Sequence, residues 1–235
     1  MTLKKQLKRL SNKQAAEDIK RYIKSSHEFY SDKTPEIKTL AKRLHQEHNL
    51  KNFYKIFNKL WKSSSPGENS LAIHTLRLYK DEFDINTWKF LKPKLREIKS
   101  WDQVDYIGEN ILGPLLLKQP SLEKEMFQIS KNENIWIKRI IIFSTFSLIN
   151  KQNIKLSVKL AEQNIYDKNI QIQKAVGIML CKISRIRPGI FKKFVLKHID
   201  MPHTTFGCAT EYIPELRKLR ALKPKRRFIL FGRGL

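Results

Sequence analysis

Two short segments decide how this chain is interpreted: SWDQVD, which begins at Ser100, and NIWIKR, which ends at Arg139. On an α-helix, residues three or four positions apart share a face. Trp101 therefore shares a face with Asp105, and Trp136 shares one with Arg139. Two such helices packed side by side would form an aromatic-walled cleft that holds a carboxylate and a guanidinium.

The rest of the sequence predicts an all-α fold. The chain has 8 glycines and 9 prolines in 235 residues, and apolar residues recur every three or four positions. Equivalent helices recur roughly every 35–45 residues, as in paired-helix repeats. Stacked pairs curve into a solenoid whose concave face binds long polymers, so we expect a single repeat domain over residues 1–235 with a concave basic groove. The expected helices cover about residues 3–25, 35–48, 50–61, 68–79, 86–98, 134–149, 154–164, 169–184, 188–199 and 204–219. Another helix starts at about residue 101 and is broken or kinked at 110–114, and a short helix follows Pro120.

The charge balance predicts an anionic partner. Lys and Arg number 47 and Asp and Glu 22, which gives a formal net charge of +25. Nucleic acid is the leading candidate and an anionic membrane surface the second; a Lys-rich proteome would explain part of the excess. Residues 216–235 form a basic C-terminal tail, interpreted either as an arm on phosphate or as a solvated, flexible charge run. Its cations are Arg217, Lys218, Arg220, Lys223, Lys225, Arg226, Arg227 and Arg233.

Composition argues against several other classes of protein. Two cysteines, Cys181 and Cys208, do not make a disulfide framework, and no zinc-type spacing is present. The N-terminus lacks the apolar region of a signal peptide, and the longest strongly apolar run, residues 140–143, is too short for a bilayer. The six histidines form no metal or nucleophilic cluster. We therefore expect a soluble, cytoplasmic, nucleoid-associated monomer without metal or cofactor.

The two opening segments resemble the HEAT-repeat DNA alkylation repair family, the AlkD-like DNA glycosylases. The 34 residues that separate Asp105 from Arg139 fit that family's spacing. The resemblance covers roughly residues 13–198. Three further segments carry it: Tyr22-Ile23-Lys24 leading to Thr34-Pro35, Leu60-Trp61 followed by Glu68 and Ala72, and Ile172-Gln173-Lys174-Ala175-Val176-Gly177.

The resemblance implies roles for the central residues. Asp105 would be the catalytic carboxylate, Arg139 its companion, and Trp101 the aromatic beside them. Active members also carry a Trp in a late helix, where this chain has Ile178. The expected substrate is duplex DNA that contains a cationic N3- or N7-alkylated purine, gripped by its backbone without deep base flipping. Some branches of the superfamily bind branched or distorted DNA without cleaving it, and that is the alternative function.

Chemistry fits these assignments. A cationic purine is already a good leaving group, and positive charge develops on the deoxyribose as the glycosidic bond breaks. Asp105 can stabilise that charge and orient or deprotonate the attacking water. Arg139 would bind the adjacent phosphate, and Trp101 would contact the sugar or the lesion, whereas Trp136 is interpreted as core. Without an amine nucleophile the enzyme would be monofunctional and leave an abasic site.

Each assignment has a plainer alternative. An Asp and an Arg on neighbouring helices often form only an ion pair, and isolated basic residues are usually solvated. A repeat-protein adaptor for an acidic protein or membrane is a third, weaker hypothesis. The candidates for the basic groove lining are Lys42, Arg43, Lys138, Lys174, Lys182, Arg185 and Arg187.

Overall fold

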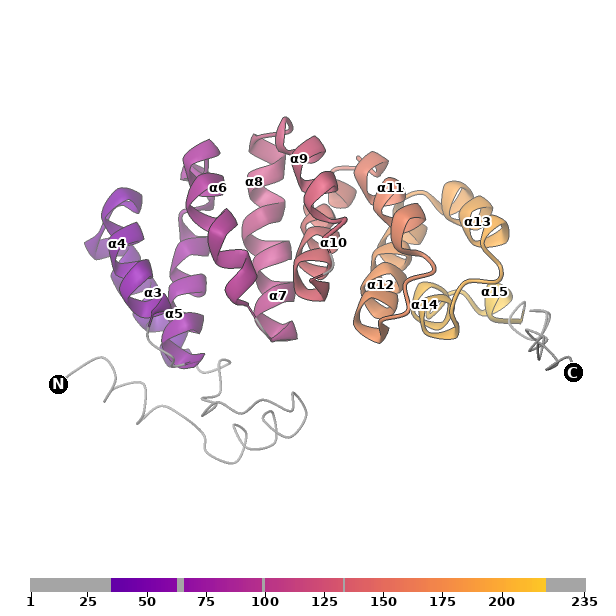
Figure 1. Cartoon of the computed structure of the whole chain (residues 1–235), viewed down its shortest axis with the longest axis horizontal. Coiled ribbons are helices and arrows are strands. Elements are labelled where there is room, and N and C mark those ends of the chain that lie inside the picture. The colour runs from indigo at the N-terminus through magenta and orange to yellow at the C-terminus, as the bar shows by residue number, and fades with distance from the viewer. Residues whose placement is uncertain (1–34, 63–65, 99, 133, 219–235) are drawn as a thin grey trace, which may run out of the picture. The chain divides into compact units, whose positions relative to one another are not determined.

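The computed structural model describes residues 35–62, 66–98, 100–132 and 134–218, and these are helical without a β-strand (Figure 1). The helix expected at 3–25, the segment Tyr22 to Thr34 and the tail beyond 218 lie outside the described residues. The α-helices are α3 (Pro35–Glu47), α4 (Leu50–Trp61), α5 (Pro66–Leu78), α6 (Ile85–Leu91), α7 (Trp101–Ile107), α8 (Gly113–Lys118), α9 (Leu122–Ile129), α10 (Ile135–Asn150), α11 (Lys155–Asn164), α12 (Ile170–Ile186), α13 (Pro188–Lys197), α14 (His203–Ala209) and α15 (Pro214–Lys218).

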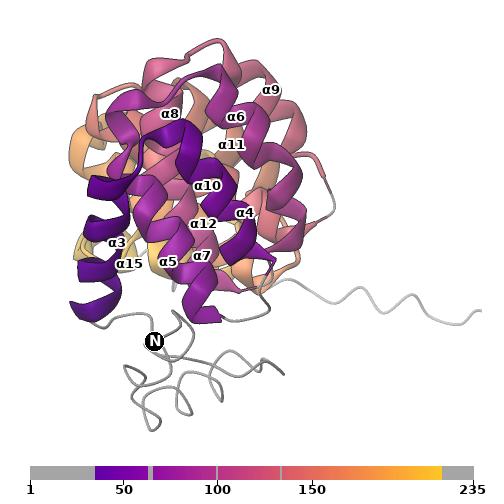
Figure 2. The ribbon, with the colours of Figure 1, turned by 90° about the vertical axis from the view of Figure 1, so that its left-hand side faces the viewer.

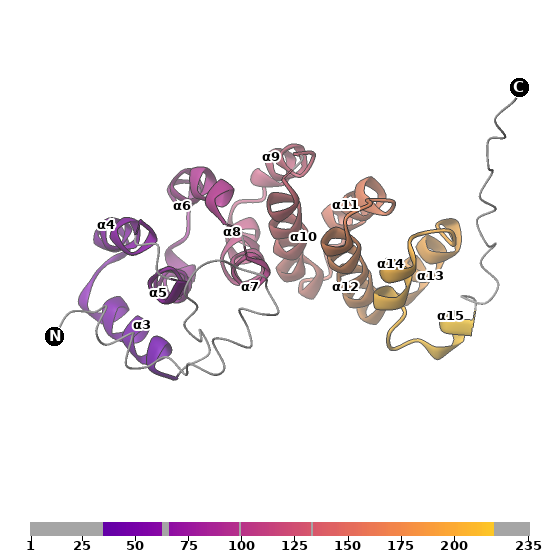
Figure 3. The same cartoon turned by 60° about the horizontal axis from the view of Figure 1, so that its bottom comes forward.

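The chain divides into two compact units, Met1–Leu156 and Ser157–Leu235. In unit 1, α4, α6 and α9 form one layer, and α3, α5, α7, α8 and α10 form the other (Figure 3). The view in Figure 2 shows the same separation of α4, α6 and α9 from α3, α5 and α7. The order of the chain alternates between the layers, which is the arrangement of helical repeats. The all-α repeat fold expected from the sequence is confirmed, whereas the single domain and the basic groove stay predictions.

Helix α10 is the central helix of unit 1. It is buried over most of its circumference, and Ile140, Ile141 and Ile142 have no exposed surface. A helix that is apolar on all sides must be surrounded by other elements. Its start is fixed by Asn134, whose side chain accepts hydrogen bonds from the backbone N–H groups of Trp136 and Ile137.

Two segments differ from the expected helices. The helix expected at 86–98 ends as α6, and a 3₁₀ segment, η2 (Lys92–Glu97), follows, because Pro93 lacks the backbone donor that a continuing α-helix needs. The helix expected at 204–219 is instead α14 and α15, separated before Pro214. The break or kink predicted at 110–114 falls where the regular α-helix is interrupted between α7 and α8. The chain continues from α7 through a π-helical turn, η3 (Gly108–Leu112), into α8.

The π-turn brings two glycines against α10. The N–H of Gly113 donates to the carbonyl of Gly108, five residues earlier. In a regular α-helix two residues five apart would point about 140° away from each other. Here both face α10: a Cβ on Gly108 would lie 2.6 Å from the Cβ of Phe143, and one on Gly113 would lie 3.1 Å from the carbonyl oxygen of Ser144. The two helices can therefore approach more closely than side chains would allow.

Gly108→Ala is expected to destabilise the protein by about 1–3 kcal/mol, because the added methyl overlaps both Phe143 and the carbonyl oxygen of Ile140, 2.7 Å away. Gly189→Ala on α13 is the matched control, since nothing lies within 4 Å of its added Cβ. It should be neutral or slightly stabilising. Urea unfolding of the three proteins measures the difference. Equal midpoints for both variants would show that α7 and α10 do not need this close approach.

In unit 2, α12 packs closely on α14. A Cβ on Gly177 would lie 2.5 Å from the Cβ of Cys208 and 2.8 Å from the carbonyl oxygen of Thr205. Glycine at this position therefore lets the two helices touch through their backbones. The side of α12 that carries Gly177 is buried, so the side chains on its opposite side reach the surface.

Candidate functional site

The structure joins Asp105 of α7 directly to Arg139 of α10. Nε of Arg139 donates to Oδ1 of Asp105 and Nη2 donates to Oδ2, both at 2.6 Å. The Arg139 side chain is 5% exposed and that of Asp105 is 22% exposed. The Arg139 side chain is therefore buried, while that of Asp105 is partly accessible.

Local packing sets this geometry. Gly108 lies beside Ile140 and Phe143, and Gly113 lies beside Ser144 and Ser147, so both chain segments advance in the same direction. The helices are thus parallel. Asp105 and Arg139 both lie on the N-terminal side of the contacts that the π-turn makes with α10. The guanidinium of Arg139 also lies over the Phe143 ring, 4.9 Å from its centroid. This packing and the two hydrogen bonds to Asp105 hold the guanidinium in place.

The pair holds the Asp105 carboxylate in a fixed orientation. Two parallel hydrogen bonds from a planar guanidinium fix both the position and the plane of a carboxylate. The sequence had assigned Arg139 to a DNA phosphate. In the structure two of its nitrogens donate to Asp105 and its side chain is buried, an arrangement that favours positioning of the carboxylate.

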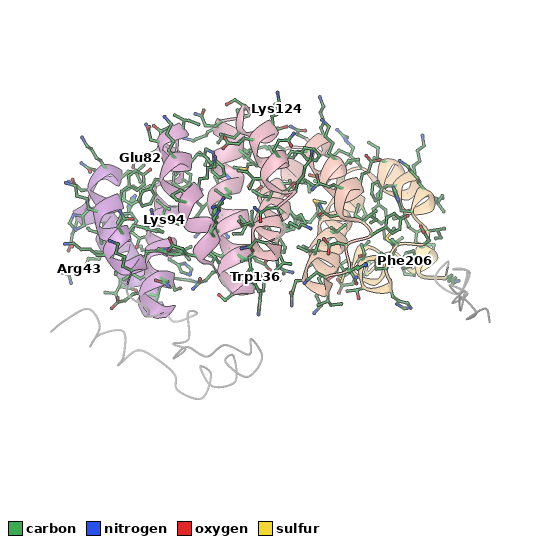
Figure 4. The ribbon with its side chains drawn as sticks, in the orientation of Figure 1. Arg43, Glu82, Lys94, Lys124, Trp136 and Phe206 are labelled. Carbon is green, nitrogen blue, oxygen red and sulfur yellow. The ribbon has the colours of Figure 1, made fainter. Side chains whose placement is uncertain are left out.

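An indole lies near the N-terminal end of each of the two helices. Trp101 and Trp136 are both half-buried. The sequence predicts that Trp136 is core, and this is wrong, because its side chain, labelled in Figure 4, is only half-buried. Trp61, on α4, is also half-buried and donates from Nε1 to Glu97 at 2.7 Å.

A second cluster next to Asp105 was missed by sequence reasoning. The ring of Tyr106 contacts that of His74 on α5, with centroids 4.3 Å apart. Burial, and then the charges of Arg77 and Lys38, lower the pKa of His74 from 6.5 to about 4. Burial also raises the pKa of Tyr106, against the opposing effect of Arg77. Two cations from α3 and α5 thus act on a ring pair beside the candidate catalytic residue.

We expect His74 to make the protein sensitive to acid. The pKa of His74 is about 4 in the folded protein, against the ordinary histidine value of 6.5 that applies to the unfolded chain. Between these two pH values the unfolded chain binds a proton that the folded chain does not. Stability present above pH 6.5 is therefore lost as the pH falls towards 4, by about 1–2 kcal/mol after discounting for partial exposure. Urea unfolding at pH 7 and pH 5 tests this: His74→Phe should narrow the gap between the two midpoints, and an unchanged gap would refute it.

The predicted basic residues of unit 1 take different positions. Lys42 and Arg43 are exposed on α3, and Arg43 is paired with Glu47 at 2.7 Å. Lys138 is half-buried on α10. Arg77, which the sequence did not single out, is exposed on the last turn of α5. Its signal in the sequence is weak, namely its position three residues after His74.

In unit 2 several predicted residues share one face of α12. Lys174, Ile178, Lys182 and Arg185 follow one another at intervals of four, four and three residues, and all four are at least partly exposed. This is the spacing of a single helix face. Arg185 lies over the ring of Tyr212, 4.8 Å from its centroid. Arg187 is exposed and follows the last residue of α12. Ile178 lies in the middle of this basic face.

The described residues hold neither a metal-binding cluster nor a membrane-spanning helix. No group of three or more His, Cys, Asp or Glu side chains in residues 35–62, 66–98, 100–132 and 134–218 could hold a metal ion. Among the helices of the same ranges, none combines the length and the hydropathy needed to cross a bilayer. The candidate site is therefore described by protein side chains alone.

Known structures share this fold. A predicted DNA alkylation repair enzyme from Enterococcus faecalis is 19% identical, with a TM-score of 0.76 over 86% of this chain and 96% of that one. AlkD2 from Streptococcus mutans is 15% identical, with a TM-score of 0.62 over 86% and 98%. The smu.31 protein from Streptococcus mutans UA159 is 15% identical, with a TM-score of 0.61 over 76% and 92%. No curated protein sequence matches the chain.

A family comparison agrees with the two segments that opened the sequence analysis. The family described as DNA alkylation repair enzyme matches residues 3–213. The match spans both units and includes the central pair of helices. The chain therefore belongs to the DNA alkylation repair enzyme family.

Proposed function

We propose that this protein is a monofunctional DNA glycosylase that hydrolyses the N-glycosidic bond of cationic N3- or N7-alkylated purines. The observation that carries the proposal is the Asp105 carboxylate, which is held by two 2.6 Å hydrogen bonds from a buried guanidinium and belongs to a side chain that is itself 22% exposed. A fixed negative charge of this kind is already oriented before the reaction begins, so it needs no reorganisation in the transition state.

The reaction follows from the chemistry of the lesion. The bond between C1′ of the deoxyribose and the purine nitrogen breaks, and its electron pair neutralises the departing base. Asp105 stabilises the positive charge that develops on the sugar. The oxygen of a water molecule then bonds to C1′, and its proton passes to Asp105 and on to solvent. The products are the free alkylated purine and an abasic site. No cofactor takes part.

Arg139 is proposed as a positioning residue. Its side chain is bound to Asp105 and only 5% exposed, so it offers little surface to a DNA phosphate. Phosphate binding is instead assigned to exposed and half-exposed cations, and double-stranded DNA is the partner. Binding should weaken steeply with salt, because each phosphate contact releases a counterion. The cations assigned to the backbone are Lys42, Arg43, Arg77, Lys138, Lys174, Lys182, Arg185 and Arg187.

A second candidate function rests on Ile178. The resemblance to AlkD-like glycosylases implies that active members carry a Trp at this position. In this chain an aliphatic side chain lies there, among the cations of α12. A protein with this basic face and without the aromatic ring could bind branched or distorted DNA without cutting the glycosidic bond.

One experiment separates the two functions. Duplex DNA methylated at guanine N7 is incubated with an excess of the protein, which we propose acts as a monomer. The released 7-methylguanine is quantified against a protein-free control. Release well above the spontaneous rate supports the glycosylase. Background release together with tighter binding to a four-way junction than to a linear duplex, at equal salt, supports the non-catalytic binder. Failure of both would remove DNA repair chemistry from this site.

A further inference from the structure

Tyr212 is the most exposed large hydrophobic side chain in the part of the chain that the structure describes, with 63% of its surface accessible. It lies between α14 and α15, in a turn closed by a 3.0 Å hydrogen bond from the backbone N–H of Ile213 to the carbonyl of Thr210. Both sides of this turn are anchored, since Thr210 has no exposed surface and Leu216 is buried. The fold therefore holds this ring at the surface.

A cation from α12 covers one face of the ring. The guanidinium of Arg185 lies 4.8 Å from the ring centroid of Tyr212, within the range of cation–π contacts. The two residues come together because α12 packs closely on α14 (Figure 1). The contact fixes the direction of the ring. Since most of the side chain stays accessible, the ring face opposite Arg185 is open to solvent.

The surface beside the ring suits a nucleic-acid strand. Lys174, Lys182 and Arg185 lie on the accessible face of α12. From Lys174 to Lys182 the helix rises about 12 Å, a length over which one DNA strand carries roughly three phosphates. Glu211 is exposed next to Tyr212, and the three cations outnumber it. Cations along a backbone, with a ring on which a base stacks, are the two parts of a surface that binds single-stranded nucleic acid.

An open ring can stack only on a base whose own face is free. In duplex DNA both faces of each base are covered by neighbouring base pairs, so a protein meets the backbone and the base edges in the grooves. A nucleotide without a pairing partner leaves the stack at the smallest cost. The exposed ring is therefore matched to an unpaired base and not to regular duplex.

We propose that Tyr212, oriented by Arg185, is a stacking platform for an unpaired base of DNA bound along α12. The proposal rests on the proposed function only for DNA as the partner. It gives Tyr212 no part in the hydrolysis, which stays with Asp105.

The test uses the full chain and three DNA duplexes built on one sequence. The first is fully paired, the second has one additional unpaired adenine, and the third carries a tetrahydrofuran residue, which has no base, in place of that adenine. Because the second and third share the same backbone, the ratio of their dissociation constants measures the contact with the base. Fluorescence anisotropy gives these constants for wild type, Tyr212→Phe and Tyr212→Ala, and thermal unfolding checks that each variant is folded.

Tyr166→Ala is the matched control, since Tyr166 is an exposed tyrosine of the same unit in a different environment. Its side chain is 46% exposed. Its hydroxyl donates to Asp200 at 2.6 Å, and its ring lies against that of His198, with centroids 5.9 Å apart. A ring beside a carboxylate repels a DNA backbone, so this tyrosine should not serve as a platform.

Loss of one stacked ring is worth roughly a 5- to 100-fold change in affinity. We expect wild type to prefer the adenine duplex over the tetrahydrofuran duplex by a factor in this range. Tyr212→Ala should lose the preference, Tyr212→Phe should keep most of it because stacking does not need the hydroxyl, and Tyr166→Ala should behave as wild type.

Four results overturn the proposal. They are a wild type without the preference, an unchanged preference in Tyr212→Ala, an equal loss of the preference in Tyr166→Ala, and a Tyr212→Ala variant that binds all three duplexes more weakly by the same factor. The last result would make Tyr212 a contact of the backbone.

Failure of this proposal can be told apart from failure of the glycosylase proposal, because release of 7-methylguanine depends on Asp105. A wild type that releases the base but does not prefer the adenine duplex overturns the stacking platform alone. A wild type that shows the preference through Tyr212 but releases no base refutes the glycosylase and supports the platform.

Discussion

Asp105→Asn is expected to slow the release of 7-methylguanine by about 10²–10³-fold in single-turnover assays, the range found when one preorganised electrostatic contact is removed from an active site. Asparagine has the same shape and can still accept a hydrogen bond from Arg139, but it carries no charge to stabilise the sugar. Affinity for undamaged duplex should stay within a few-fold, because the backbone contacts come from other residues.

Two controls make this result specific. Glu123→Gln removes a half-buried carboxylate from α9, in the other layer of unit 1, and should leave the rate within about twofold. Circular dichroism at the assay temperature checks that Asp105→Asn is folded, since it leaves the buried Arg139 without its anion. Equal rates for wild type and a folded Asp105→Asn would remove this carboxylate from the mechanism.

Local signals predicted most of the helices. Helix α4 begins at Leu50 and ends at Trp61, as expected, because Asn49 caps its first turn, with Oδ1 accepting from the N–H of Asn52 at 2.9 Å. Its buried residues, among them Phe53, recur with the helical period. The helix predicted at 134–149 is α10 to within one residue at each end, for the same reason of a capping asparagine followed by a long apolar run.

What the sequence did not predict depends on contacts between helices. The spacing of Asp105 and Arg139 suggested neighbouring helices, but their direct hydrogen bonds require the close approach that Gly108 and the π-turn permit. The pair of His74 and Tyr106 joins residues of two separate helices, α5 and α7, and neither has a local signal for the other. Such contacts follow from tertiary packing and have no period in the sequence.

The ion pair itself should show an asymmetric energetic effect. Arg139 is the more buried partner, with a side chain 5% exposed against 22% for Asp105. Removing Asp105 strands a buried guanidinium, which is the costly case at about 3–5 kcal/mol. Removing Arg139 leaves a carboxylate that water can partly reach. We therefore expect Asp105→Leu to lower stability more than Arg139→Met, with stability measured as the free energy of unfolding in urea.

The double variant decides whether this asymmetry has the stated cause. In Asp105→Leu/Arg139→Met neither charge is stranded, and an apolar pair of similar volume often replaces a buried ion pair at little cost. We expect it to be more stable than Asp105→Leu alone, with a coupling energy of about 2–3 kcal/mol between the two changes. Additive effects, or a larger loss for Arg139→Met than for Asp105→Leu, would contradict the burial argument. A stable double variant that releases no 7-methylguanine would show that the Asp105 carboxylate is needed for the reaction and not for the fold.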